Sequence, residues 1–288
     1  MTTHSAYQQL QNQLCELYNN REATNIADWV MEYVTKQTKI ERIIHKTQSI
    51  NAEQAKQLEG ITVQLLQYRP VQYVLQEAWF AGMKFYVDEA VLIPRPETDE
   101  LVEWAVEQAK ATMVTPSRLA ILDIGTGSGC IPIALKKKLP QADVNAIDIS
   151  HQALAVARKN ADNLQAAIHL QKIDFLDESG WGKLGIYNII ISNPPYIKQS
   201  EKNSMSQHVT LFEPNMALFV SDNDPLIFYR KIAIFGQQHL VEGGHIFVEI
   251  NEALGQETVA LFNSCGYSTE LKKDLQGKDR MVKASIPF

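Results

Sequence analysis

Three closely spaced glycines follow an apolar run and form a loop that could bring the main chain close to a ligand. They are Gly125, Gly127 and Gly129, and the run Leu119 to Ile124 before them is typical of a buried strand. Glycine adopts positive φ angles without steric cost, so a ligand can approach the backbone of such a loop closely. In an open α/β sheet, a loop of this kind lies at the carboxyl ends of the strands, where ligands bind.

A carboxylate and an aromatic residue after the next two predicted strands suit the remaining parts of a nucleoside. Asp148 follows the predicted strand 143–147, about 20 residues after the loop, where a carboxylate accepts hydrogen bonds from ribose hydroxyls. Phe175 follows the predicted strand 168–173 and could stack on an adenine ring or fill the core. Cys130 stands where a dinucleotide fingerprint has its third glycine. The pattern therefore favours S-adenosylmethionine (S-adenosyl-L-methionine), which has no pyrophosphate, over NAD.

An Asn-Pro-Pro-Tyr segment follows the fourth predicted strand, 187–192, and consists of Asn193, Pro194, Pro195 and Tyr196. Two adjacent prolines are stiff and donate no backbone hydrogen bonds, so they form a rigid rim at the sheet edge. A planar amide or aryl amine nitrogen is a poor nucleophile, because its lone pair is delocalised. The Asn193 side-chain oxygen and the Pro194 carbonyl could accept its two N–H groups, while Tyr196 stacks on the flat group. This indicates methyl transfer to nitrogen but does not identify the nitrogen.

Residues 1–75 show apolar residues at helical spacing and no catalytic pattern. Asn51 is a predicted helix N-cap, with Gln54 in the capping-box position. Seven basic and seven acidic side chains make the segment neutral. We predict a small all-α bundle as the first domain.

The second predicted domain, residues 76–288, begins in a linker and continues as an α/β sheet. The stretch 71–93 is rich in Val, Tyr, Phe and Trp, with Gly82 in its middle, and predicts a β-hairpin that joins the domains. From residue 119, strands alternate with helices, which predicts a doubly wound, Rossmann-like parallel sheet covered on both faces. The predicted helices span 97–111, 131–139, 151–163 and 225–240, and the further strands span 246–250, 267–273 and 280–286.

Composition and charge argue against several other classes of protein. The net charge is −6, which disfavours a large non-specific contact with nucleic acid. The three cysteines form no CxxC pair, and the histidines show no metal-ligand spacing, so we expect neither a disulfide framework nor a metal site. No secretory signal and no run of 18 apolar residues is present, so we expect a cytoplasmic protein without a membrane span.

Taken together, the motifs resemble those of the peptide chain release factor N5-glutamine methyltransferases. The resemblance covers the chain from about residue 69 onward. The family commonly has Gly at the position of Gln76, Glu at that of Asp99 and, in some members, Trp at that of Phe175. The segments that carry the resemblance are Gln72-Tyr-Val-Leu75, Phe80-Ala-Gly82, Leu92-Ile-Pro-Arg-Pro-Glu-Thr98, residues 121–130, Ser192-Asn-Pro-Pro-Tyr-Ile197, Glu213-Pro214 and Gly277-Lys-Asp-Arg280.

The resemblance implies a class I S-adenosylmethionine-dependent methyltransferase domain, preceded by a helical bundle and a hairpin linker. It implies that the substrate is the glutamine in the Gly-Gly-Gln loop of class I peptide chain release factors. Because one glutamine offers few contacts, we predict that the bundle docks on the body of the release factor. Asn193, Pro194, Pro195 and Tyr196 would hold the glutamine amide. The implied cofactor site consists of Gly125, Thr126, Gly127, Ser128, Gly129, Asp148, Phe175 and Asn193.

Three alternatives stay open at the level of the sequence. The sister family that methylates a glutamine of a ribosomal protein shares the Asn-Pro-Pro-Tyr segment, but usually has Pro-Arg-Ser-Pro in the linker, where this chain has Pro94-Arg95-Pro96-Glu97. A nucleic-acid adenine N6-methyltransferase shares the same tetrapeptide, but would normally carry a basic recognition region. A scaffold that binds S-adenosylmethionine without turnover is the third.

Overall fold

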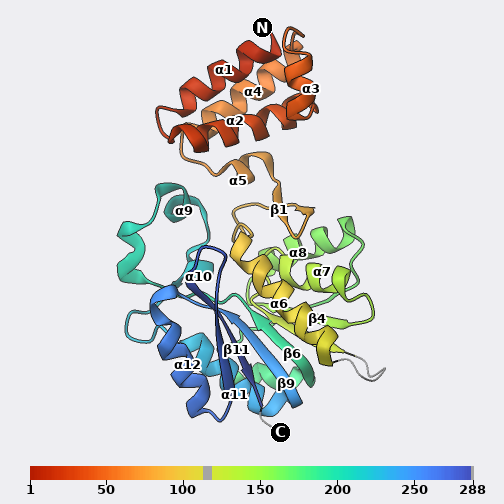
Figure 1. Ribbon diagram of the computed structural model, residues 1–288, viewed down its shortest axis with the longest axis vertical. Helices are drawn as coiled ribbons and strands as arrows, with labels where there is room; N and C mark the ends of the chain where they lie inside the picture. Colours follow the sequence, from red (N-terminus) through yellow and green to blue (C-terminus); the bar gives the residue numbers. More distant parts are fainter. Residues whose placement is uncertain (113–118, 287–288) are drawn as a thin grey trace. The chain divides into compact units, whose positions relative to one another are not determined.

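The computed structural model describes residues 1–112 and 119–286 (Figure 1). The chain divides into two compact units. The first comprises Met1–Glu77 with Ser206–Phe212, and the second comprises Ala78–Met205 with Glu213–Phe288. Within the described residues, no helix combines the length and the apolar character that crossing a membrane requires.

The first unit is a bundle of helices. Its core is formed by residues such as Leu14, Val30 and Leu65, whose side chains are fully buried. The predicted capping box is confirmed, because Gln54 donates its backbone N–H to Asn51 Oδ1 at 2.8 Å and accepts from the Asn51 N–H at 3.0 Å. The helices in Met1–Glu77 are α1 (Thr3–Leu14), α2 (Asn20–Thr35), α3 (Lys39–Ile44), α4 (Ala52–Leu65) and α5 (Val71–Leu75).

The predicted hairpin over 71–93 is too long. Only β1 (Ala78–Phe80) and β2 (Met83–Phe85) pair, around Ala81 and Gly82 at positive φ. Residues 71–75 instead form α5, and residues 86–93 form no strand. The error has a physical reason. Val, Tyr and Phe in this segment report burial, and a helical turn or an irregular chain can bury them as well as a strand does.

The second unit contains a seven-stranded sheet with the order β10-β11-β9-β6-β3-β4-β5. The predicted Rossmann-like α/β fold is confirmed, but the sheet is not wholly parallel, since β11 runs antiparallel to both of its neighbours. The turn 274–278 between β10 and β11 is too short for the crossover that parallel strands need. The strands are β3 (Ala120–Ile124), β4 (Asp143–Asp148), β5 (His169–Lys172), β6 (Tyr187–Ser192), β9 (Leu240–Glu249), β10 (Ser268–Lys273) and β11 (Asp279–Ser285).

Helices cover both faces of this sheet (Figure 1). Alternate strand residues point to opposite faces. Ile121 and Ile189 pack in one apolar cluster with α6 (Pro96–Thr112) and α7 (Cys130–Lys138), whereas Leu122 and Ile190 pack in another with α11 (Ile227–His239) and α12 (Gly255–Ser264). α8 (His151–Asn163) begins with the predicted Ser150 cap, whose Oγ accepts from the Ala153 N–H. Because β3 pairs in parallel with both β4 and β6, the carboxyl ends of these three strands meet at one edge of the sheet.

Before and after β6, the segment between residues 176 and 220 also holds short elements that were not predicted from the sequence. β7 (Ile197–Lys198) and β8 (Phe219–Val220) pair in parallel. The remaining elements are η1 (Glu178–Lys183), η2 (Gln199–Ser204), α9 (Gln207–Phe212) and α10 (Asn215–Leu218); η3 (Glu252–Leu254) follows β9.

Candidate active site

The glycine loop joins β3 to α7 and leaves space above its backbone. Gly125, Gly127 and Gly129 have φ angles of +76°, +53° and +80°. A Cβ added at Gly125 or Gly127 would meet no atom within 4 Å, so this part of the loop is open to a ligand. A Cβ at Gly129 would lie 3.1 Å from the Ala157 Cβ on α8. The first two glycines therefore provide a cradle, and the third allows close packing of a helix.

A buried asparagine holds this loop in place. Asn160, on α8, is 1% exposed. Its Nδ2 donates to the backbone carbonyls of Ser128 and Tyr86, both at 2.9 Å, and its Oδ1 accepts from the Tyr86 N–H at 2.7 Å. One side chain thus ties the glycine loop to the segment that follows the hairpin.

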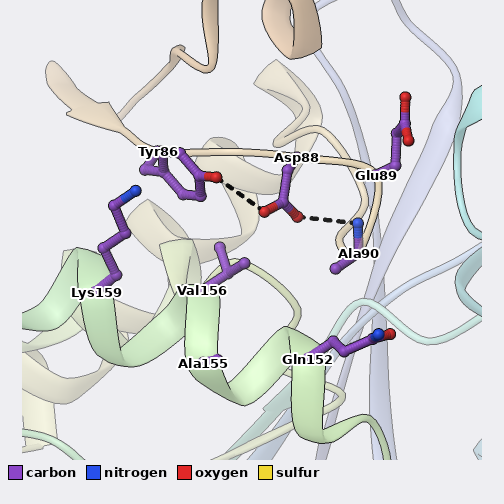
Figure 2. A pocket seen from close by; sticks show the side chains of 8 residues that line it. All are labelled: Tyr86, Asp88, Glu89, Ala90, Gln152, Ala155, Val156 and Lys159. Carbon is purple, nitrogen blue, oxygen red and sulfur yellow. Dashed lines mark hydrogen bonds between the residues drawn. The ribbon is translucent and has the colours of Figure 1, made fainter.

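A cavity of about 610 Å³ lies between α8 and residues 86–90 (Figure 2). Several of its polar side chains contact one another within the cavity wall. The Lys159 Nζ lies 3.1 Å from the centroid of the Tyr86 ring, and Asp88 accepts from the Tyr86 hydroxyl and the Ala90 N–H, each at 3.0 Å. These contacts fix the start of the segment that leads to α6. The other residues that line the cavity are Glu89, Gln152, Ala155 and Val156.

The structure brings Asp148 to the glycine loop, as the spacing indicated. Its Oδ2 accepts from the Gly127 N–H at 2.9 Å, and its Oδ1 accepts from the Ser150 N–H at 2.8 Å. Burial raises the pKa of this carboxyl, and the backbone hydrogen bonds oppose that rise. Ile149, the next residue, is 41% exposed and offers an apolar surface beside the carboxylate. Ile149 was not predicted as a site residue, although its place directly after the predicted ribose-binding carboxylate is a signal in the sequence.

Phe175 lies in the core and not on an open surface. Its side chain is 5% exposed, stacks on Trp181 with 5.4 Å between ring centroids, and meets Phe235 edge-on. The core role that the sequence left open is therefore the one observed. Stacking of Phe175 on an adenine ring stays a prediction.

Buried polar atoms without partners gather beneath the loop. Within the described part of the chain, neither the carboxylate oxygens of Asp123 nor the hydroxyls of Thr126 and Ser128 make a hydrogen bond of good geometry, although the Thr126 hydroxyl lies near enough to Asp123 to lower the pKa of its carboxyl. Burial raises the pKa of Asp123 to about 7. Unpaired buried polar groups are costly, and a polar, positively charged ligand would satisfy them. S-adenosylmethionine fits this requirement, because its ammonium and sulfonium groups are cationic and its carboxylate accepts hydrogen bonds.

Asn193 and Tyr196 are both connected by hydrogen bonds to one buried carboxylate, that of Glu249. Asn193 Nδ2 donates to Thr98 Oγ1 at 3.0 Å, and Thr98 Oγ1 donates to Glu249 Oε2 at 2.6 Å. The Tyr196 hydroxyl donates to Glu249 Oε1 at 3.0 Å. Asn193 is half-buried, and no described residue donates to its Oδ1. The amide oxygen is therefore available to a substrate.

Burial raises the pKa of Glu249, while the hydrogen bonds from Thr98 and Tyr196 and the nearby Arg280 charge oppose that rise. Glu249 is 1% exposed at the end of β9. Thr98 belongs to one of the motif segments but was not predicted as a site residue, and Glu249 was not predicted at all. Neither residue had a periodicity or spacing signal that would connect it to Asn193.

Two further motif segments hold the residues around Thr98. Glu213, which is buried, accepts from Arg95 Nη2 at 2.5 Å and from the Ile93 N–H at 3.3 Å. Asp274 accepts from Arg280 Nε at 3.1 Å. The same turn is fixed to the first helical turns of α6, where Glu97 accepts from Gln276 Nε2 and Glu100 accepts from the Leu275 N–H. These contacts place the start of α6 at the carboxyl edge of the sheet.

No group of three or more His, Cys, Asp or Glu side chains in the described ranges is arranged to hold a metal ion.

Comparisons with known proteins agree with this arrangement. The PrmC N-terminal domain family model matches residues 5–75, and the methyltransferase small domain model matches residues 108–218. A protein of Flavobacterium psychrophilum named release factor glutamine methyltransferase is 40% identical over 274 residues, which cover 95% of each chain. A protein of Bacteroides thetaiotaomicron with the same name is 44% identical over 237 residues, which cover 82% of this chain and 83% of that one.

Among solved structures, the hMettl16 catalytic domain in complex with the MAT2A 3′UTR hairpin 6 aligns with a TM-score of 0.53 over 83% of each chain. The two sequences are 15% identical, so this likeness concerns the fold alone.

We expect Asp148→Ala to weaken binding of S-adenosylmethionine by roughly ten- to a hundred-fold, because a charge-assisted contact to the ribose is lost. Isothermal titration calorimetry measures the change. Asp162→Ala, which alters an exposed carboxylate on α8, is the control and should bind as the unaltered protein does. Unchanged affinity of Asp148→Ala would remove this residue from the cofactor site.

Asp123→Asn tests the unpaired carboxyl beneath the loop. In the folded protein the pKa of Asp123 is about 7, above its ordinary 3.8, so the folded state binds more protons than the unfolded state between these values. Deprotonation of Asp123 therefore lowers the stability of the cofactor-free folded state progressively as the pH rises through this window. We expect the variant to gain more stability over the unaltered protein at about pH 8 than at about pH 5, measured by chemical denaturation. An equal difference at both pH values would contradict the assignment.

Proposed function

Because this chain belongs to the family of release factor glutamine methyltransferases, we propose that it methylates the N5 amide nitrogen of the glutamine in the Gly-Gly-Gln loop of class I peptide chain release factors. The protein is an S-adenosylmethionine-dependent protein glutamine methyltransferase. Its modification of release factors belongs to translation termination, and we accordingly place it in the cytoplasm. The observation that carries the choice of an amide substrate is the Asn193 oxygen, which is held in place and has no partner among the described residues.

The residues around the glycine loop are proposed to hold the cofactor. Asp148 would accept from the ribose hydroxyls, and Ile149 would lie against the adenine. Asp123 would face the cationic groups, and the open backbone at Gly125 and Gly127 would admit the methionine portion. When bound, S-adenosylmethionine supplies a methyl group on a positively charged sulfur and leaves as a neutral thioether.

The Asn-Pro-Pro-Tyr segment is proposed to hold the glutamine amide. Asn193 Oδ1 and the Pro194 carbonyl would accept one N–H group each, which places the nitrogen lone pair toward the methyl group. Tyr196, fixed by its hydroxyl on Glu249, would lie against the flat face of the amide, and Pro195 would keep this rim rigid. As the N–C bond forms, one N–H proton is lost to solvent water. The protein contributes alignment and electrostatics and no strong base.

The first unit is proposed to bind the body of the release factor. A single glutamine offers few contacts, so its selection among surface glutamines requires a second contact area. The bundle displays an apolar patch on α3, where Ile40, Ile43 and Ile44 are 71%, 64% and 68% exposed. Exposed apolar patches of this kind mark protein interaction sites.

Mass spectrometry tests the central assignment. After incubation of a class I release factor with the protein and S-adenosylmethionine, we expect one added methyl group on the Gly-Gly-Gln peptide, located on the glutamine by fragmentation. Asn193→Ala should lower turnover by about 100-fold and change cofactor affinity less, because it removes one positioned polar group. Asn163→Ala, at an exposed asparagine of α8, is the matched control. Turnover of Asn193→Ala near that of the control would show that the amide-alignment mechanism is wrong.

A chain that begins at Ala78 tests the role of the bundle. We expect it to bind S-adenosylmethionine normally and to lose most of its kcat/KM on the intact release factor. Its rate on a short Gly-Gly-Gln peptide should barely change. Equal efficiency on the intact protein would refute docking, and loss of cofactor binding would instead indicate that the bundle supports the fold.

Substitutions in the full chain test docking through the apolar patch on α3. Ile40→Lys combined with Ile43→Lys should raise KM for the intact release factor, whereas Val63→Lys, at an exposed apolar position of α4, should not.

A further inference from the structure

The hydrogen bonds that lead from Glu249 to Asn193 have a fixed direction. An ionised carboxylate only accepts hydrogen bonds, whereas a hydroxyl has one proton to donate. The Thr98 and Tyr196 hydroxyls and the nearby Arg280 charge favour the ionised form of Glu249 against the effect of burial on its pKa. The Thr98 proton is used on Glu249 Oε2, at 2.6 Å, so the Thr98 oxygen can only accept from its other neighbour. That neighbour is the Asn193 amide, 3.0 Å away, and only its nitrogen carries protons. The amide must therefore present its nitrogen to Thr98 and its oxygen to the opposite side.

We infer that Thr98 and Glu249 are positioning residues for the methyl transfer: the buried carboxylate acts through the Thr98 hydroxyl to fix the Asn193 side chain with its oxygen facing the substrate. The inference rests on the proposed function and deepens it. Thr98 is 2% exposed and Glu249 is 1% exposed, so water does not readily replace either partner. The two ends of an asparagine amide are nearly the same size, and packing alone would not distinguish them. The direction of the hydrogen bonds supplies that distinction.

This arrangement determines which substrate group the site accepts. An oxygen at this position pairs with an N–H donor, and therefore with the amide nitrogen of glutamine. It repels a carboxylate, which would bring a second acceptor to the same place. Glu249 and Thr98 thereby contribute to the choice of glutamine over glutamate, although neither is required to touch the substrate.

Thr98→Val and Thr98→Ser test the positioning role. Valine keeps the shape of threonine but has no hydroxyl, so the Asn193 amide loses its orienting partner. We expect Thr98→Val to lower kcat on a Gly-Gly-Gln release factor by about 10- to 100-fold at saturating cofactor, and Thr98→Ser to restore most of it. The matched control is Thr258→Val, which removes the fully buried hydroxyl that donates to the Leu254 carbonyl at 2.8 Å on α12. It should leave kcat near that of the unaltered protein.

Glu249→Gln gives a readout that a merely structural role would not change. The carboxamide has donors as well as acceptors, so Thr98 can donate its proton to Asn193, and the Asn193 nitrogen can then face the substrate. The probe is a release factor in which the target glutamine is replaced by glutamate, used as a competitive inhibitor of methylation. We expect it to inhibit Glu249→Gln at about tenfold lower concentration than the unaltered protein, corresponding to one hydrogen bond of about 1.4 kcal/mol.

The outcomes separate this inference from the proposed function. If the unaltered protein methylates no Gly-Gly-Gln release factor, the proposed function fails and the inference fails with it. If the unaltered protein is active and Thr98→Val turns over as fast as Thr98→Ser and Thr258→Val, the inference alone is overturned. Equal inhibition of the unaltered protein and Glu249→Gln by the glutamate form would also overturn it.

Discussion

A carboxylate buried in a protein is costly unless its oxygens accept hydrogen bonds, and the hydrogen bonds that Glu249 receives organise the candidate site. Thr98 comes from the first turn of α6 and Tyr196 from the segment after β6, and each donates a hydroxyl proton to it. The Tyr229 hydroxyl, from α11, donates to the Glu249 backbone carbonyl at 3.0 Å. Three segments are thus held at the end of β9, and Asn193 is connected to the same carboxylate by its hydrogen bond to Thr98. Loss of the carboxylate would leave Thr98 and Tyr196 without their acceptor, whereas the Tyr229 bond to the backbone would remain.

Much of the fold could be predicted because its signals are local. Apolar periodicity located the strands of the seven-stranded sheet, and side-chain chemistry located the Asn51 and Ser150 caps. The failures occurred where tertiary context decides between structures of similar composition. The aromatic and β-branched residues around Val71 and Val87 are buried but do not pair in a β-sheet. The antiparallel direction of β11 depends on the length of the turn before it.

The site could be predicted only in the parts that follow each other closely in sequence. The glycine loop precedes Asp148 within a strand–helix–strand unit, and the structure joins them by a hydrogen bond from Gly127. Thr98 lies 95 residues from Asn193 and 151 from Glu249, and one sequence contains no signal for such contacts. The role of Asn160 could not be predicted either, because a polar residue on an amphipathic helix usually faces solvent, whereas this one is buried beneath the loop.

The paired acceptors proposed for the glutamine also bear on how a catalytic cycle ends. An unmodified amide has two N–H groups, one for Asn193 Oδ1 and one for the Pro194 carbonyl. After transfer, the nitrogen keeps a single N–H group, and the new methyl group occupies the position of the other. One acceptor then loses its partner and faces an apolar group, which weakens the product complex relative to the substrate complex. The proposed geometry for aligning the amide would thus also favour product release and limit the nitrogen to one methyl group.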